Sequence, residues 1–285
     1  MYSFFVSDLH GVISRYEKLF NIVLNEKPEM VYIGGDILPS FTNRIVNSKT
    51  VDDFIDDYIV KNLCLLKEQM KEKYPKIFII LGNDDIKTEE EKIIDATKSG
   101  IFNYINCTNL KINKINIFGY CYVPPTPFLL KDWEKYDVSR YIDPGCVSPE
   151  EGCRSVKAGD SEIKYSTIKD DLEKLTKGED LTNSVFLFHS PPYQTNLDRV
   201  ANDGKYFEHV PLDLNAGSIA IKKFIEVRQP LLTLHGHIHE STRLSGTWKD
   251  KIGKTFCFNA SHDGPELSLI KFDIENLNEA VRVLI

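Results

Sequence analysis

The segment at residues 235–239 has the sequence HGHIH, which places three imidazole groups within five residues. A core histidine usually occurs singly, whereas clustered neutral imidazoles are typical ligands of zinc, copper, iron or nickel. The apolar run at 230–234 comes directly before the cluster and predicts a short buried strand. Because ligands of open α/β sheets bind beyond the carboxyl ends of strands, this position favours a metal site. A solvated turn is the alternative.

Four other predicted strands also end in side chains that can bind metal. The β-rich runs lie at residues 2–7, 30–33, 77–81 and 184–188. With the histidines above, the potential ligands in chain order are Asp8, His10, Asp36, Asn83, His189, His237 and His239. Each of these residues has an ordinary alternative, such as a helix cap for Asp8 or Asp36 and a turn for Asn83. Their shared position after strands favours a single metal site at one sheet edge.

The segments between these runs predict the elements that position the ligands. Apolar residues at helical spacing over 16–24 separate the first two strands, and strand, helix, strand is the unit of a parallel sheet. A long apolar stripe predicts a helix over 51–73, with Thr50 as N-cap and Asp53 as its acidic partner. Shorter helices are predicted after Thr88, over 168–175 and over 220–228, and a hairpin over 111–120. Beyond His239 we expect only strands, at 241–248, 254–258, 266–273 and 279–284.

Residues 121–165 break this pattern and predict an ordered insertion within a single domain that spans 1–285. Prolines and aromatic residues are frequent there, and a loop of this length is uncommon unless it is functional or disordered. So many aromatic residues argue against disorder. One hypothesis is that the insertion forms a cap over the metal site, where Trp133 or a tyrosine could stack on a nucleobase or aryl group. The alternative is that these aromatic residues cover the insertion's own small core.

Composition excludes several classes of protein. The hydrophobic fraction of 42% and charged fraction of 27% are those of a globular protein, and the formal net charge is −7. A negative charge argues against an extended nucleic-acid surface. No run has the length of a membrane span or the pattern of a signal peptide. The six cysteines lack zinc-like spacing, so we expect reduced thiols and a cytoplasmic location, with a disulfide between Cys146 and Cys153 as the alternative.

The five motifs together resemble those of the calcineurin-like metallophosphoesterases. That family's pattern appears here, in order, as Asp8-Leu9-His10, Gly35-Asp36, Gly82-Asn83-Asp84, His189 and Gly236-His237-Ile238-His239. The resemblance covers nearly the whole chain. It implies an α/β fold, a four-layer α/β/β/α sandwich of two mixed β-sheets flanked by helices.

The same resemblance implies two divalent metal ions. One would be held by Asp8, His10, Asp36 and His239, and the other by Asp36, Asn83, His189 and His237, so that Asp36 bridges them. Mixed imidazole and carboxylate ligands suit manganese, which we expect, or iron, zinc or nickel, better than calcium. Two ions bring a charge of +4 and the two aspartates bring −2, which leaves a net charge of +2 that attracts phosphate.

This chemistry predicts a two-metal-ion hydrolase of phosphate esters. We expect a phosphodiesterase or phosphoanhydride hydrolase that acts on a small or nucleotide-like phosphoester through a metal-bridging hydroxide. The alternative is a non-catalytic scaffold or binding module of the same fold. Because all seven ligand positions are filled, the enzyme is favoured.

Asp84 departs from the resemblance, because many members of the family have a histidine there that is thought to assist the leaving group. A carboxylate beside metal ions is expected to be ionised at neutral pH and is therefore a poor general acid. Substrates whose leaving groups need little protonation are then favoured. Asp84 either orients a water molecule or has a structural role.

Other polar residues carry weaker hypotheses. Arg199 could bind the substrate phosphate, although a surface salt bridge is the alternative. His209 and His262 could supply a proton to the leaving group, and His235 has no counterpart among the usual ligands. The Asp-Arg-Gly segment that follows the Gly-Asp motif in the protein phosphatases of the family is missing here, which argues against a phosphoprotein substrate.

Overall fold

In residues 1–40 and 53–285, which the computed structural model describes, the chain forms two six-stranded mixed sheets and one two-stranded ribbon. The first sheet has the order β14-β13-β1-β2-β3-β4, and β1 to β4 run parallel. Its strands are β1 (Tyr2–Val6), β2 (Met30–Gly34), β3 (Lys76–Ile80), β4 (Asn103–Tyr104), β13 (Ser268–Asp273) and β14 (Asn276–Leu284). The last two strands extend the sheet antiparallel to β1.

The second sheet has the order β11-β12-β10-β7-β6-β5, with four parallel strands at its centre and antiparallel strands at both edges. Its strands are β5 (Thr108–Ile112), β6 (Ile115–Tyr120), β7 (Ser184–Phe188), β10 (Leu232–His235), β11 (Lys249–Ile252) and β12 (Thr255–Asn259). Every residue of β7 and β10 is buried, as expected for parallel strands covered on both faces.

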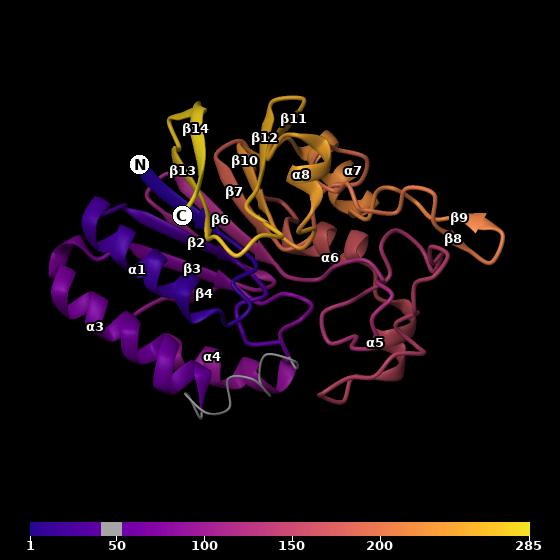
Figure 1. Ribbon diagram of the computed structural model, residues 1–285, viewed down its shortest axis with the longest axis horizontal. Coiled ribbons are helices and arrows are strands. Elements are labelled where there is room, and N and C mark those ends of the chain that lie inside the picture. The colour runs from indigo at the N-terminus through magenta and orange to yellow at the C-terminus, as the bar shows by residue number, and fades with distance from the viewer. Residues whose placement is uncertain (41–52) are drawn as a thin grey trace.

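The two sheets pack face to face, and helices cover their outer sides (Figure 1). Phe258 of β12 meets Phe272 of β13 between the sheets, with ring centroids 5.9 Å apart. The helices beside the first sheet are α1 (Ile13–Glu26), α3 (Lys61–Met70) and α4 (Glu90–Thr97), and those beside the second are α6 (Ile168–Leu175) and α7 (Ile219–Arg228). Phe224 of α7 packs on Phe186 of β7. The predicted four-layer α/β/β/α sandwich is confirmed.

Two predicted elements differ from the structure. The helix expected over 51–73 begins as a π-helical segment, Phe54–Val60, whose first N–H groups bond to the Asp53 carboxylate. The Thr50 cap lies outside the described residues. The strand expected over 241–248 is wrong, because α8 (Ser241–Ser245) stands there and ends at Gly246 with φ of 81°. A glycine in the left-handed region after a polar segment is a helix stop.

The insertion contains one assigned helix within 121–165, α5 (Asp160–Tyr165), and isolated β-bridges such as that between Leu130 and Cys153 order the rest together with side-chain contacts. Trp133 is fully buried, and its indole N–H donates to the carbonyl oxygen of Asp85 at 2.7 Å. The hypothesis that Trp133 stacks on a substrate is therefore wrong, because this residue belongs to the main hydrophobic core and ties the insertion to the loop after β3. All six cysteines are free, so the alternative disulfide is not formed.

A second extended loop follows β7 and carries the hairpin of β8 (Tyr206–Phe207) and β9 (Val210–Pro211), which projects from the body of the molecule (Figure 1). None of the helices in the described part of the chain has the length and apolar character needed to cross a membrane.

Candidate metal centre

The loops that carry the predicted ligands have an unusual backbone conformation. Asp8, His10, Asp36 and His237 all have positive φ, at 57°, 47°, 50° and 73°. Residues other than glycine rarely adopt this left-handed region, and such strain persists only where surrounding contacts hold it. The Asp8 N–H donates to Gly35 O at 3.0 Å and the His10 N–H to Asp36 O at 2.7 Å, which binds the loop after β1 to the loop after β2.

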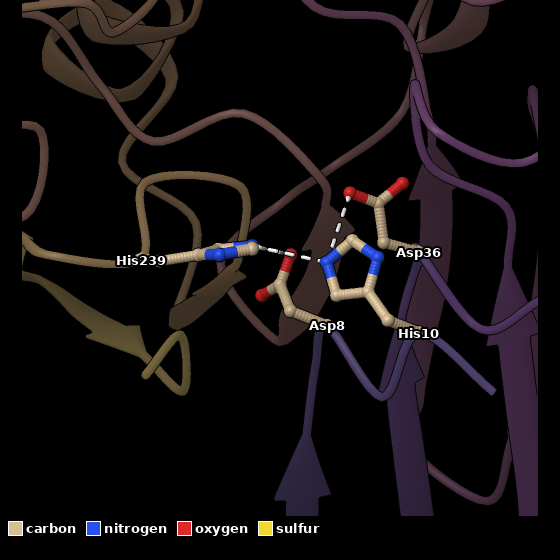
Figure 2. Close-up of side chains that lie close together, drawn as sticks. All are labelled: Asp8, His10, Asp36 and His239. Carbon is tan, nitrogen blue, oxygen red and sulfur yellow. Dashed lines mark hydrogen bonds and ion pairs between the residues drawn. The ribbon is translucent and has the colours of Figure 1, made fainter. Parts of the chain in front are cut away.

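Four of the predicted ligands form one cluster. One potential ligand atom from each of Asp8, His10, Asp36 and His239 lies within 4.8 Å of the others, and Figure 2 shows the four side chains gathered at the strand ends. The Nε2 atoms of His10 and His239 face each other at 3.1 Å. His239 Nε2 also lies 3.4 Å from Asp8 Oδ1, and His10 Nε2 lies 3.8 Å from Asp36 Oδ2.

This spacing fits one transition-metal ion. Two imidazole nitrogens that bind the same ion at about 2.1 Å are separated by about 3 Å. The Nε2 atoms of His10 and His239 have that separation, 3.1 Å. With two carboxylates beside them, the donor set matches the mixed ligands that manganese, iron and zinc accept.

The other predicted ligands meet the same cluster at Asp36. His189 Nε2 lies 3.3 Å from Asp36 Oδ2 and 3.0 Å from Asn83 Oδ1. The ring of His237 is 5.2 Å from the ring of His189, between centroids. The tertiary structure thus brings all seven residues to one edge of the two sheets. Their assignment as metal ligands stays a prediction.

Hydrogen bonds to backbone and side chains orient these groups. The His189 Nδ1–H donates to Gly34 O at 2.8 Å, which leaves Nε2 facing Asp36. The hydroxyl of Ser261 donates to Asp8 Oδ2 at 2.6 Å, and the His237 N–H contacts both carboxylate oxygens of Asp8. Such outer contacts fix the tautomer and orientation of metal ligands. Ser261 carries no sequence signal, because it is an isolated serine between two strands.

Asp85 is a second residue that sequence reasoning missed. Its buried carboxylate accepts the N–H groups of Gly82, Ile37 and Leu38 at 2.8, 3.1 and 2.7 Å. Burial and the charge of Asp36 raise the pKa of Asp85 to about 7, although the backbone hydrogen bonds oppose this shift. The side chain therefore ties the loop after β2 to the loop after β3. Its place beside the Asn83-Asp84 pair was the available sequence signal.

The electrostatics of the cluster favour cations. Burial opposes protonation of His10, but the hydrogen bond with Asp84 and the charges of Asp36 and Asp8 raise its pKa to about 9. Burial would raise the pKa of Asp36, yet His189 and His10 lower it to about 2. The pKa of Asp8 is likewise held below its usual range, against burial, by His239 and its neighbours. Two buried carboxylates that stay ionised create the negative potential that divalent ions need.

His235 has a structural role. It is fully buried, with Nδ1 2.9 Å from Ser190 O and Nε2 2.7 Å from the hydroxyl of Thr233. Burial lowers the pKa of its imidazole to about 3. Both ring nitrogens are engaged away from the ligand cluster, which agrees with leaving His235 out of the ligand set.

The structure favours the alternative interpretation of Arg199. Its guanidinium forms an ion pair with Asp203 at 2.6 Å and a hydrogen bond with the carbonyl oxygen of Val200. These contacts hold the arginine within its own loop. His209 is exposed on the β8–β9 hairpin, whereas His262 lines the cleft described next and contacts Glu266 at 3.0 Å.

The ligand cluster opens into a cleft of about 940 Å³. Its described lining includes His10, Asp36, Asn83 and Asp84 at one end, and insertion residues 124–128 and 143–146. The loop after β7 contributes residues such as Val200 and Leu212. The insertion therefore covers part of the predicted metal site, as hypothesised, but it presents prolines and Phe128 rather than Trp133.

Known proteins share both the sequence pattern and the fold. A profile of the calcineurin-like phosphoesterase family matches residues 1–241. No curated protein matches the sequence. The solved structure of TT1561 of Thermus thermophilus has a TM-score of 0.57 at 14% identity, and the alignment covers 99% of this chain and 98% of that chain. A dimetal phosphatase from Danio rerio has a TM-score of 0.53 at 9% identity, with coverages of 100% and 95%. At such identities the two structures show a common fold, and the profile match extends over most of the sequence. The chain therefore belongs to the calcineurin-like phosphoesterase family.

Proposed function

We propose that this protein is a two-metal-ion hydrolase of small phosphodiester or phosphoanhydride substrates. The observation that carries the proposal is the cluster of Asp8, His10, Asp36 and His239, whose potential ligand atoms lie within 4.8 Å of one another. Asp36 extends this cluster to His189 through a 3.3 Å contact. Membership of the calcineurin-like phosphoesterase family supports the same chemistry, as does the fold shared with a protein described as a dimetal phosphatase.

The proposed division of ligands follows these contacts. Asp8, His10 and His239 would hold one ion, and Asn83, His189 and His237 the other, with Asp36 shared between them. Manganese is the ion that we propose, because the set mixes carboxylate, amide and imidazole donors. When bound, two such ions supply positive charge for a phosphate group and lower the pKa of a bound water toward about 7.

The residues of this chain supply charge that holds the cations and a cleft that can hold the substrate. Asp36 and Asp8 keep their charge although they are buried, so they hold the cations at a fixed place. The cleft of about 940 Å³ has room for a nucleotide-sized substrate beside the cluster. Its wall at residues 124–128, which includes Phe128, offers an apolar surface for the organic part of that substrate. We propose that the reaction takes place in the cytoplasm. We also propose that the protein binds a small phosphoester and has no extended surface for nucleic acids.

Reconstitution of the purified protein tests this function. The protein would be stripped of metal with a chelator, reloaded with Mn²⁺, and assayed against nucleotides, dinucleotides, aryl phosphodiesters and phosphomonoesters. We expect about two Mn²⁺ per chain, and hydrolysis of diesters or anhydrides that is lost on stripping and restored on reloading. Tight metal binding without turnover of any substrate would favour the non-catalytic scaffold. Failure to bind metal would overturn the proposed hydrolase and favour the non-catalytic scaffold.

A further inference from the structure

Asp84 contacts two of the proposed ligands at the same time. Its carboxylate Oδ2 lies 3.2 Å from Nδ1 of His10, and its backbone N–H donates to Oδ1 of Asp36 at 2.8 Å. The side chain is 42% exposed, so it lies at the surface of the cleft while its inner oxygen faces His10. Asn83, the residue before it, contacts His189 at 3.0 Å.

The contact with His10 determines which ring nitrogen is available to a metal. An imidazole that binds a metal is neutral, with one N–H and one lone pair, and a carboxylate beside Nδ1 keeps the hydrogen on that nitrogen. The lone pair is then on Nε2. That atom is the one that faces His239 Nε2 at 3.1 Å and Asp36 Oδ2 at 3.8 Å. Asp84 therefore selects the tautomer in which His10 can bind the ion between these residues.

The backbone contact has a parallel effect on Asp36. Because Oδ1 accepts the Asp84 N–H, this oxygen is turned toward the loop after β3. The other oxygen, Oδ2, is left facing both His10 and His189 at 3.8 and 3.3 Å. One loop residue thus orients the histidine that follows β1 and the aspartate that follows β2.

We infer that Asp84 is a positioning residue for the metal centre, which acts through His10 and Asp36, and not a proton donor to the leaving group. The inference rests on the proposed function, since it presumes that the cluster binds metal. It explains why a carboxylate can stand where the family pattern has a histidine. An acceptor at this position keeps His10 in its metal-binding tautomer, a role for which a carboxylate oxygen is suited.

Metal affinity tests this role without reference to catalysis. Binding of Mn²⁺ to the metal-stripped protein would be titrated calorimetrically for wild type, Asp84→Ala and Asp84→Asn. Removal of an outer-shell partner typically lowers metal affinity by about 10- to 100-fold, and we expect that loss for one of the two ions in Asp84→Ala. The amide oxygen of Asp84→Asn can still accept from His10 Nδ1, so this variant should keep most of the affinity.

Asp263→Ala is the matched control. Asp263 lines the same cleft, but its carboxylate pairs with Arg243 at 2.7 Å. If the three variants bind Mn²⁺ as tightly as wild type, or if all three lose affinity equally, Asp84 has no specific positioning role and the inference is overturned. Absence of Mn²⁺ binding in wild type would instead overturn the proposed function, so the two failures are distinguishable.

Discussion

At the scale of single residues, the Asp36 carboxylate joins the two groups of proposed ligands. Its Oδ2 atom faces His10 Nε2 at 3.8 Å and His189 Nε2 at 3.3 Å. The side chain is buried and its pKa is lowered to about 2 by His189 and His10, in spite of burial. A change at Asp36 therefore reaches both proposed ions, whereas a change at His189 reaches one.

We accordingly expect Asp36→Asn to lower the occupancy of both metals, and His189→Ala to empty chiefly one. Bound metal per chain would be measured by elemental analysis after dialysis, together with phosphodiesterase activity. His209→Ala, which removes an exposed histidine, is the control and should leave both quantities unchanged. Full occupancy and full activity in Asp36→Asn would rule out the shared carboxylate.

The position of Asp84 also predicts how the rate depends on the leaving group. If the Asp84 carboxylate serves His10, from which it lies 3.2 Å, and does not donate a proton to the leaving oxygen, charge accumulates on that oxygen in the transition state. Aryl phosphodiesters should be hydrolysed well and alkyl monoesters slowly. Asp84→His, assayed at saturating Mn²⁺, should flatten this dependence. The measurement is kcat/KM across a series of leaving groups, and equal slopes for the two proteins would mean that the proton arrives by another route.

At the scale of elements, the insertion is fastened to the second sheet through the start of α7. Asp137, which is buried, accepts the hydroxyl of Ser218 at 2.5 Å and the N–H groups of Ile219 and Ala220 at 2.6 and 3.2 Å. Ser218 is itself the N-cap of α7 and accepts from Ile221 N–H. Asp137 thus satisfies N–H groups that no residue within the helix can bond, and it connects the wall of the cleft to the scaffold.

Asp137→Ala should destabilise the protein by about 1–2 kcal/mol, the usual effect of losing a helix cap. For a protein of this size, each kcal/mol corresponds to a fall in Tm of about 2–4 °C. Thermal denaturation followed by circular dichroism would measure it. Glu173→Ala, a change on the exposed face of α6, should leave Tm nearly unaltered. An equal Tm for the two variants would contradict the role of Asp137 as an anchor.

At the scale of the whole molecule, the buried core of sheets and helices contains several tyrosines. Tyr16, Tyr32 and Tyr120 are each no more than 2% exposed. Burial raises the pKa of all three hydroxyl groups above the usual value of about 10. Tyr16 also donates its hydroxyl hydrogen to Ile37 O at 2.7 Å, which joins α1 to the loop after β2.

These tyrosines predict a loss of stability in alkali. A group whose folded pKa is raised contributes stability that is complete below its unfolded pKa, here about 10, and is lost as the pH rises toward the folded pKa. The free energy of unfolding in urea should therefore be steady between pH 8 and 9 and fall above pH 10. Tyrosinate absorbance near 295 nm should show that part of the tyrosines ionise only on unfolding. If all of them titrate near pH 10 in the folded protein, the prediction is wrong.

The sequence by itself determined the sheets and the set of chemical groups at their edge. Apolar runs such as those of β3 and β7 predict buried strands, and polar residues that directly follow them are expected at the strand ends. That argument needs only local pattern and spacing, which is why it located Asp8, Asp36, Asn83 and His189 together. The order of the four layers was predicted from the family resemblance and not from the local pattern.

Tertiary structure alone decided what each polar side chain contacts. Ser261 meets Asp8 across 253 positions of sequence, and Trp133 meets Asp85 across 48. The contacts of Asp84 with His10 and of Arg199 with Asp203 depend on how the loops fold, and the sequence did not predict them. Hydrogen bonds depend on distances of a few tenths of an ångström between segments remote in the chain. Residue type and local periodicity do not encode those distances, which packing of the two sheets and the insertion determines.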